Sequence, residues 1–393
     1  MSANLLTEKE FINCSIDFPK PHSSVKEEFY YVNNGAVLYK YEGLNHNTYI
    51  DYCNSLIKSG YNEIKQDNSV YSISAFRKED SLIYTYYLEK EKILRIIYEP
   101  NAILPVNTQL ENGRCELYQL SLDQTEVNCG MSYVIKLCDG SFFIIDGGYF
   151  TKGECDRLYD FLCDYSNGEI IISGWFCSHA HEDHFGCLID FIEKYSNCVS
   201  IENLYYNFPN MYIPSAKNWK KDDIASTERF YSVVNKYLTD VSHIKLHTGQ
   251  KFNVRNLEIE VLATHEDLYP CDFKNFNDTS TVISITVNGK RIMFLGDTGD
   301  ELSDILIHTY GENLKSDIVQ VAHHGFNGAK KEVYELIDAV TVLWPTADYC
   351  FEENLHRDAN KYLFKESKTA KEHIISGYGT KSIILSRYTI IFI

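Results

Sequence analysis

The chain has 393 residues, of which 44% are hydrophobic, and its formal net charge is −18 at pH 7. This length exceeds that of an average domain, and the apolar content argues against wholesale disorder. The acidic balance disfavours long nucleic acid as a partner, because a phosphate backbone requires a basic surface. No stretch is long and apolar enough for a membrane span, and the amino terminus carries no secretory signal, so we expect a cytoplasmic protein.

Residues 1–108 are expected to form a separate α+β domain. Apolar side chains at helical spacing predict a helix over residues 48–59, which Gly60 ends. Runs of β-forming residues predict a sheet around this helix, at residues 29–32, 36–39, 70–74, 82–86 and 93–98. No group of catalytic residues occurs here, so we interpret the domain as a packing module or as the contact of a homodimer.

Residues 109–393 alternate strand pairs with helices. Turn residues between apolar strands predict hairpins at 138–140 and 288–290, and helices are expected at 154–165, 187–195 and 228–238. Residues 201–241 are interpreted as an insertion. We expect its aromatic side chains to reach the rim of an active site, with packing into a local core as the alternative. The candidate rim residues are Tyr205, Tyr206, Phe208, Tyr212 and Trp219.

Three histidines and an aspartate lie within six positions, directly after an apolar, strand-like segment: His179, His181, Asp183 and His184. Side chains alternate along an extended segment, so His179 and His181 point the same way and can bind one cation. Asp183 and His184 follow a turn and can reach a second cation. Imidazole nitrogen and carboxylate oxygen suit zinc and similar transition metals, so the spacing indicates a metal site.

This stretch resembles the HxHxDH signature of the metallo-β-lactamase-fold hydrolases. Further segments resemble motifs of that superfamily in the same order, each at the end of an expected strand: Asp146 with Gly147 and Gly148, then Asp297, then His323, His324 and Gly325. The resemblance covers roughly residues 115–393. It implies an α/β fold, the αβ/βα sandwich of that superfamily, for residues 109–393.

The resemblance also implies two divalent metal ions, with zinc preferred and manganese or iron as alternatives. It assigns His179 and His181 to the first ion, Asp183 and His184 to the second, and Asp297 to a bridging position. A third histidine conventionally completes the first site. The candidates are His243, His247 and His265, and His265 is preferred because it ends an alternating strand.

The last ligand is His323 or His324, since neighbouring residues at a strand end face opposite ways. We prefer His324, because it precedes Gly325 as in the superfamily motif. His323 would then donate a hydrogen bond to negative charge that develops on the substrate. Asp146, in a turn formed by Gly147 and Gly148, is expected to orient the histidine loop.

The implied reaction is hydrolysis by a hydroxide held between the two metals, with Asp183 steering it or accepting its proton. Residues 277–281 and the final His-His-Gly most resemble two branches of the superfamily, the hydrolase domains of bacterial DNA-uptake channels and the phosphorylcholine esterases. Both are associated with phosphodiesters, so we expect a small or medium-sized phosphodiester as substrate. The alternatives are a thioester or lactone hydrolase and a non-enzymatic metal-binding interaction protein.

Overall fold

The computed structural model describes residues 19–21, 27–33, 35–67, 70, 72–109, 112–151, 153–211, 219–270, 273, 276–386 and 390–392. Internal contacts divide the chain into two compact units. The first contains Met1–Ile103 and Pro209–Pro214, and the second contains Leu104–Phe208 and Ser215–Ile393. Among the described residues, no helix has the length and apolar character needed to cross a membrane.

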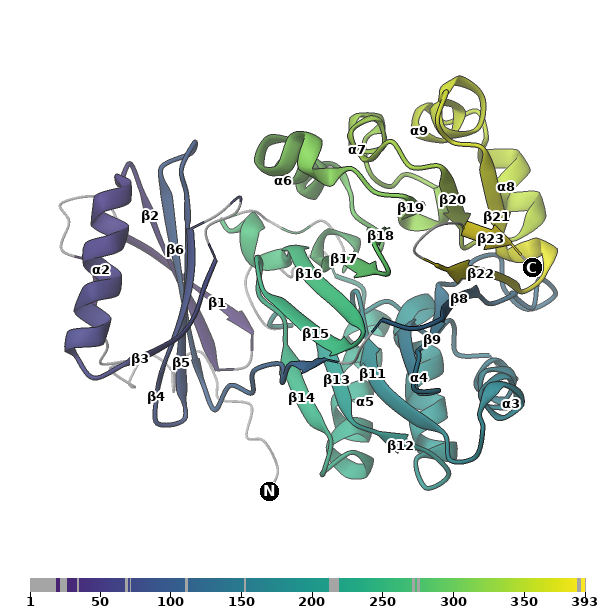
Figure 1. Ribbon diagram of the computed structural model, residues 1–393, viewed down its shortest axis with the longest axis horizontal. Helices are drawn as coiled ribbons and strands as arrows, with labels where there is room; N and C mark the ends of the chain where they lie inside the picture. The colour runs from purple at the N-terminus through teal and green to yellow at the C-terminus, as the bar shows by residue number, and fades with distance from the viewer. Residues whose placement is uncertain are drawn as a thin grey trace. The chain divides into compact units, whose positions relative to one another are not determined.

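The first unit is a six-stranded antiparallel sheet with the helix α2 packed against it (Figure 1). The strands follow the order β1-β2-β6-β5-β4-β3. Their bounds are β1 Glu27–Asn33, β2 Ala36–Glu42, β3 Asn62–Asp67, β4 Ser72–Lys78, β5 Ser81–Leu88 and β6 Ile93–Pro100. The five predicted strand runs overlap five of these strands. Strand β3 is absent from the prediction because its polar sequence, at the edge of the sheet, has no apolar alternation.

Helix α2 (His46–Lys58) confirms the helix predicted over residues 48–59. The side chain of Asn45 caps it by accepting a hydrogen bond from the backbone N–H of Thr48 at 3.0 Å. The rings and methyl groups of its buried face, including Tyr49 and Leu56, join one apolar cluster with residues of the sheet. Burial of that face supplies the stability that a short isolated helix lacks.

The second unit contains two sheets. The first sheet has the order β14-β13-β11-β10-β9-β8-β22-β23, with β12 beside β11. Its strands are β8 Cys115–Gln119, β9 Ser132–Lys136, β10 Phe142–Asp146, β11 Ile171–Phe176, β12 Ser200–Ile201, β13 Asn203–Tyr206, β14 Ser242–Lys245, β22 Lys381–Leu385 and β23 Ile390–Phe392.

The second sheet has the order β21-β20-β19-β18-β17-β16-β15-β7. Its strands are β7 Thr108–Gln109, β15 Lys251–Arg255, β16 Leu257–Ala263, β17 Val282–Val287, β18 Lys290–Phe294, β19 Ile318–Gln320, β20 Thr341–Trp344 and β21 Glu372–Ile375. Side chains from both sheets, such as Phe143 of β10 and Phe294 of β18, share a single apolar core. The two sheets therefore pack face to face.

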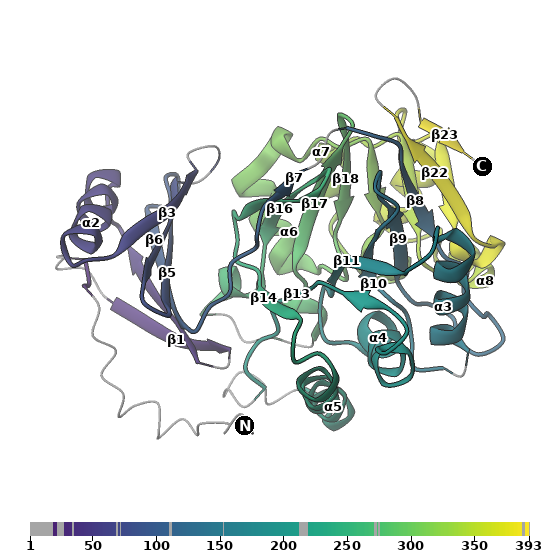
Figure 2. The ribbon, with the colours of Figure 1, turned by 60° about the horizontal axis from the view of Figure 1, so that its bottom comes forward.

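Helices cover the outer sides of the two sheets. Helix α4 contacts β10 of the first sheet and α6 contacts β16 of the second. Figure 2 shows α3 and α4 gathered along the first sheet. The helices are α3 Glu154–Tyr165, α4 Glu182–Tyr195, α5 Lys221–Tyr237, α6 Asp300–Tyr310, α7 Lys331–Ile337, α8 Asp348–Asn354 and α9 Asp358–Lys361. This arrangement confirms the αβ/βα sandwich.

Two predicted element boundaries and the predicted insertion need correction. Helices α4 and α5 begin at Glu182 and Lys221, earlier than the predicted residues 187 and 228, because their polar first turns carry acidic residues that favour a helix start without apolar spacing. Strands β12 and β13 pair in parallel with β11, so residues 201–206 belong to the first sheet. The inserted segment is thus shorter than residues 201–241.

Parallel pairing brings the polar loops to one edge of the sandwich. Strand β10 runs parallel to β11, and β18 runs parallel to β19. The carboxyl ends of parallel strands lie at the same edge of a sheet, which is where open α/β sheets place their ligands. The ends of these four strands and the loops that follow them contain Asp146, the histidine motif, Asp297 and the His323–His324 pair.

Close packing inside the first sheet leaves no room for a side chain at Gly174 in β11. A Cβ atom there would lie 2.7 Å from the Phe143 ring and 2.8 Å from the Tyr205 ring. Gly174→Ala should therefore lower the free energy of unfolding by about 1–3 kcal/mol through overpacking, measured by urea denaturation. Glu258→Ala, at an exposed position of β16, is the control and should change it by less than about 0.5 kcal/mol. Equal stability of the two variants would contradict this account of β11.

Candidate metal centre

The histidine motif spans the end of β11 and the first turn of α4. His179 lies in the extended segment, and His181 is the residue that precedes the helix, with φ −99° and ψ 148°. Asp183 and His184 lie in the first turn of α4. The predicted alternation holds, since Nε2 of His179 and Nδ1 of His181 are 3.2 Å apart.

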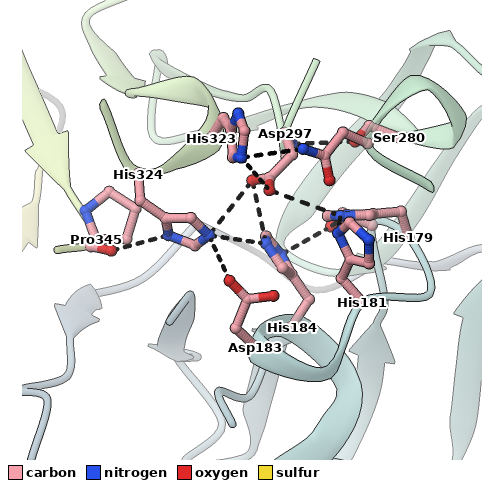
Figure 3. Close-up of polar contacts among 12 residues, drawn as sticks. His179, His181, Asp183, His184, Ser280, Asp297, His323, His324 and Pro345 are labelled. Carbon is pink, nitrogen blue, oxygen red and sulfur yellow. Dashed lines mark hydrogen bonds and ion pairs between the residues drawn. The ribbon is translucent and has the colours of Figure 1, made fainter. Parts of the chain in front are cut away.

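Asp297 follows β18 and lies at the middle of the group (Figure 3). Its Oδ1 is 3.1 Å from His184 Nε2 and 3.6 Å from His324 Nε2, and its Oδ2 is 3.7 Å from His179 Nε2. The carboxylate therefore lies between His179 on one side and the His184–His324 pair on the other. A bridging ligand needs such a position.

The orientation of His184 is fixed by Asp146. The Asp146 carboxylate accepts hydrogen bonds from the Ser178 backbone N–H at 2.7 Å and from the Ser178 hydroxyl at 2.8 Å, and its Oδ2 is 2.6 Å from His184 Nδ1. Asp146 has φ 55° and is followed by Gly148 with φ 101°, a tight turn in which glycine avoids steric conflict. This is the orienting position expected for Asp146.

The tautomers of His184 and His324 follow from their outer partners. Nδ1 of His184 faces a carboxylate, and Nδ1 of His324 faces the Pro345 carbonyl oxygen at 2.9 Å, so each Nδ1 must donate. In the neutral rings the Nε2 atoms then carry lone pairs, and these two atoms are 3.2 Å apart. Asp183 Oδ2 lies 2.9 Å from the same Nε2 of His324.

Four acceptor atoms thus converge on a buried volume, from His184, His324, Asp183 and Asp297. Asp297 Oδ1, although close to His184 Nε2, receives no hydrogen bond of suitable geometry. Buried acceptors without a donor are costly unless positive charge compensates them. Divalent metal ions supply that charge, so the donor set fits the implied metals.

The local electrostatics also favour cation binding. Burial raises the pKa values of Asp183 and Asp297, but the neighbouring rings of His184 and His324 outweigh burial and hold both pKa values below the usual range. For those two rings, burial lowers the pKa, and the surrounding carboxylates reverse this to a net increase. Burial and His184 lower the pKa of His179. The carboxylates are therefore ionised, and His179 is neutral with a lone pair to offer. His184 and His324 carry a second proton on Nε2, and a metal ion would displace this proton when it binds there.

Two groups of ligand-type atoms stand out among the described residues: His179 with His184 and Asp297, and Cys129 with Asp183 and His324. Within each group the atoms lie within 4.8 Å of one another. The sequence assigned His184 to the second ion, whereas the structure groups it with His179 and Asp297, and its Nε2 also lies 3.2 Å from His324 of the other group. Cys129 was not anticipated, because no spacing links it to the histidine motif.

His323 and His324 face different ways, as expected for neighbours. Both adopt positive φ, 51° and 54°. His323 Nδ1 lies 3.0 Å from the Asn327 carbonyl oxygen and its Nε2 lies 3.0 Å from the Asn277 side-chain nitrogen. Both ring nitrogens of His323 thus have partners outside the centre, while His324 directs Nε2 into it. His323 still lies near the carboxylate, at 4.0 Å from Asp297 Oδ2.

His265 does not join the centre, contrary to the preferred assignment. It is fully buried, with Nε2 3.1 Å from Asn207 Oδ1, and it packs beside the ring of Tyr269. The chain turns at this residue into a 3-10 helix, His265–Leu268, capped by Thr264. That turn directs the ring away from the end of strand β16. Burial lowers the pKa of His265 to about 4, so this ring is neutral.

The two other candidates also lie elsewhere. His247 Nδ1 is 3.0 Å from the Glu266 carboxylate, and His243 Nε2 is 3.0 Å from the Leu238 carbonyl oxygen. Among the described residues, neither belongs to a metal-ligand group. A carboxylate that the sequence did not single out, Asp223 of α5, instead approaches His181 Nε2 at 3.9 Å.

Most of the predicted rim residues are interior. Tyr205 packs between Phe143 and Phe252, and Phe208 packs against Phe230 of α5. Tyr206 is also buried. Phe230 of α5 covers Tyr206 and Phe208, and Tyr205 lies in the core between the two sheets, so these rings are interior as in the alternative interpretation. Tyr212 lies outside the described residues.

Trp219 is the predicted rim residue that approaches the centre. Its ring centroid is 4.5 Å from that of Phe276, and the Phe276 ring lies 5.7 Å from His181. Trp219 itself is buried, so its position is behind Phe276 rather than on an open surface.

Comparison with known proteins gives one family and several distant likenesses. The family model of the metallo-beta-lactamase superfamily matches residues 130–337. A search of curated proteins found no significant match. Among solved structures, the chain is similar to the diiron β-hydroxylase CmlA from Streptomyces venezuelae, with 10% identity, a TM-score of 0.42, and coverage of 74% of this chain and 55% of that one. The chain therefore spans about half the length of CmlA.

Two further likenesses are of the same kind. Zn²⁺-bound PqqB from Methylobacterium extorquens has 10% identity and a TM-score of 0.32, with coverage of 53% of this chain and 70% of that one. The short form of human tRNase Z has 12% identity and a TM-score of 0.34, with coverage of 58% and 91% respectively.

Metal analysis of two variants tests the composition of the centre. His184→Ala should lower the zinc content of the purified, zinc-loaded protein by at least about half, because it removes a ring of the first group whose Nε2 also lies 3.2 Å from His324 of the second. His265→Ala removes an equally buried histidine from outside the centre and should leave the zinc content unchanged. Plasma mass spectrometry measures the content, and circular dichroism verifies folding. Loss of zinc in His265→Ala alone would restore His265 as a ligand and refute its position outside the centre.

Proposed function

Since the chain belongs to the metallo-beta-lactamase superfamily, we propose that it is a metal-dependent hydrolase that acts on a phosphoric diester of small or medium size. The observation that carries the proposal is the convergence of imidazole and carboxylate acceptors around Asp297. Members of this superfamily are mostly hydrolases, and a buried cluster of acceptors is costly to maintain without a bound cation.

The donor set fits two divalent transition-metal ions, with zinc as the first choice and manganese or iron as alternatives. His179, His181 and Asp297 would hold one ion, and Asp183, His324 and Asp297 the other, with His184 within reach of both. When bound, such ions polarise the scissile ester and lower the pKa of water toward neutrality.

Charge balance favours an anionic substrate. Two divalent ions bring more positive charge than the carboxylates of Asp183 and Asp297 return, so the loaded centre is electropositive. A phosphodiester carries one negative charge and complements it. The overall charge of −18 disfavours a long polyanion, so the proposed substrate is small.

Asp183 is the proposed acceptor of the proton that the attacking water loses. Its side chain is 18% exposed, compared with 2% for Asp297, so it is the more accessible of the two carboxylates. His323, 29% exposed at the edge of the centre, is the proposed donor to a phosphoryl oxygen. In that role Nε2 must carry a proton, and the amide nitrogen of Asn277, which lies 3.0 Å from Nε2, must move away from it.

A panel of substrates tests the reaction class. The zinc-loaded protein should hydrolyse bis(p-nitrophenyl) phosphate and thymidine monophosphate p-nitrophenyl ester faster than a thioester, a lactone or nitrocefin. Faster hydrolysis of the thioester or the lactone would contradict the proposed phosphodiesterase activity and support the alternative thioester or lactone hydrolase. Tight zinc binding with no turnover of any substrate would instead favour a metal-binding interaction protein.

The role of Asp183 is tested by an isosteric change. Asp183→Asn should lower kcat at least about a hundredfold, which corresponds to roughly 3 kcal/mol of transition-state stabilisation, with little change in melting temperature. Asp190→Asn, on the same helix but paired with Arg229 at the surface, is the control and should stay within about twofold of the parent. A kcat for Asp183→Asn close to that of the control would refute the role.

A further inference from the structure

The thiol of Cys129 completes a group of three different ligand types. Sγ of Cys129 is 3.4 Å from Asp183 Oδ2, which is 2.9 Å from His324 Nε2, and the three ligand atoms lie within 4.8 Å of one another. Thiolate, carboxylate and imidazole are all zinc ligands. We propose that Cys129 is a thiolate ligand of the second metal ion and makes that site selective for zinc over manganese. This inference rests on the proposed function and adds a ligand and a metal preference to it.

The backbone holds these ligands in one place. The segment that follows β20 contacts two of them, because the Pro345 carbonyl oxygen is 2.9 Å from His324 Nδ1, and Thr346 pairs with Cys129 in an isolated β-bridge. The third ligand, Asp183, is linked to the segment that contains Cys129, since the Met131 backbone N–H donates to the Asp183 carbonyl oxygen at 3.0 Å. The three side chains are thus positioned by mutual backbone contacts rather than by chance proximity.

A fourth donor points independently to a bound cation. Asp297 Oδ1 is buried and receives no hydrogen bond of suitable geometry, and it lies 3.6 Å from the same His324 Nε2. As the bridging carboxylate of the proposed function, Asp297 would add a fourth donor to Cys129, Asp183 and His324. Four is the coordination number that zinc prefers in proteins with nitrogen, oxygen and sulfur ligands.

The thiol is also reachable from solvent. Cys129 lines an open cavity of about 400 Å³ together with residues 124–128, Tyr149 and Tyr349. A metal site needs such an entry path. Added ions and thiol reagents can therefore reach Sγ without unfolding the protein.

The binding step is an exchange of a proton for a metal. The Cys129 S–H bond breaks, a sulfur–metal bond forms, and the proton passes to the solvent, with no change in oxidation state. Sulfur donors favour zinc and cobalt(II) over manganese(II), because softer ions bind thiolate more strongly. The selectivity therefore resides in this one atom of the group.

Cobalt(II) substitution tests the ligand directly. The metal-free protein titrated with cobalt(II) should develop a near-ultraviolet thiolate-to-cobalt charge-transfer band. Cys129→Ser should lose this band, weaken zinc binding at the second site by about tenfold or more, and change manganese binding much less. Cys350→Ser, which alters a buried thiol of α8, is the matched control and should keep the band.

The outcomes separate this inference from the proposed function. Cobalt binding by the parent protein without a charge-transfer band, or persistence of the band in Cys129→Ser, would overturn the role of Cys129 and leave the hydrolase proposal intact. Failure of the parent protein to bind either cobalt or zinc would overturn the metal centre itself and this ligand with it. An unchanged melting temperature in Cys129→Ser verifies that its fold is intact.

Discussion

The carboxylate of Asp146 controls the geometry of the whole centre. It accepts two hydrogen bonds from Ser178 and contacts Nδ1 of His184. This one carboxylate therefore contacts both the loop after β11 and the first turn of α4. Because Nδ1 of His184 is engaged on the outer side, its Nε2 has to face Asp297 and His324. This contact orients His184 in the way that outer carboxylates generally orient metal-binding histidines, as the Pro345 carbonyl oxygen does for His324.

Local patterns predict much of this fold. The runs of β-forming residues in β5 and β6, the Asn288–Gly289 turn and the helical spacing in α2 and α3 depend on neighbours within a few residues, and the structure confirms each of them. The core of the candidate centre is equally local, because His179, His181, Asp183 and His184 follow one another. Asp297 and His324 follow apolar strands. Their motifs occur along the chain in the same order as in the superfamily, and this order identified them as the remaining candidate ligands.

The remaining features depend on contacts between distant residues. His265 ends an alternating strand, as a ligand would, but its Nε2 is hydrogen-bonded to the side-chain oxygen of Asn207. Asn207 is distant in the sequence, and no local pattern reveals that partner. Cys129 lies close to Asp183 only because Met131 pairs with the first turn of α4. The sequence around Tyr205 and Tyr206 fits a binding rim and a core equally well. Only their packing against distant elements, such as that of Tyr206 against α5, decides between the two.

The division of the chain has a consequence for synthesis on the ribosome. The first unit includes Pro209–Pro214 as well as Met1–Ile103, and within it the Asn210 backbone N–H donates to the Val32 carbonyl oxygen at 3.0 Å. Residues 1–103 emerge long before this segment does. At translation rates of about 5–20 residues per second, the delay is on the order of 5–20 s. The first unit is therefore complete only after residues 104–208 of the second unit have been translated, and the contact of Asn210 with its strand β1 forms no earlier than that.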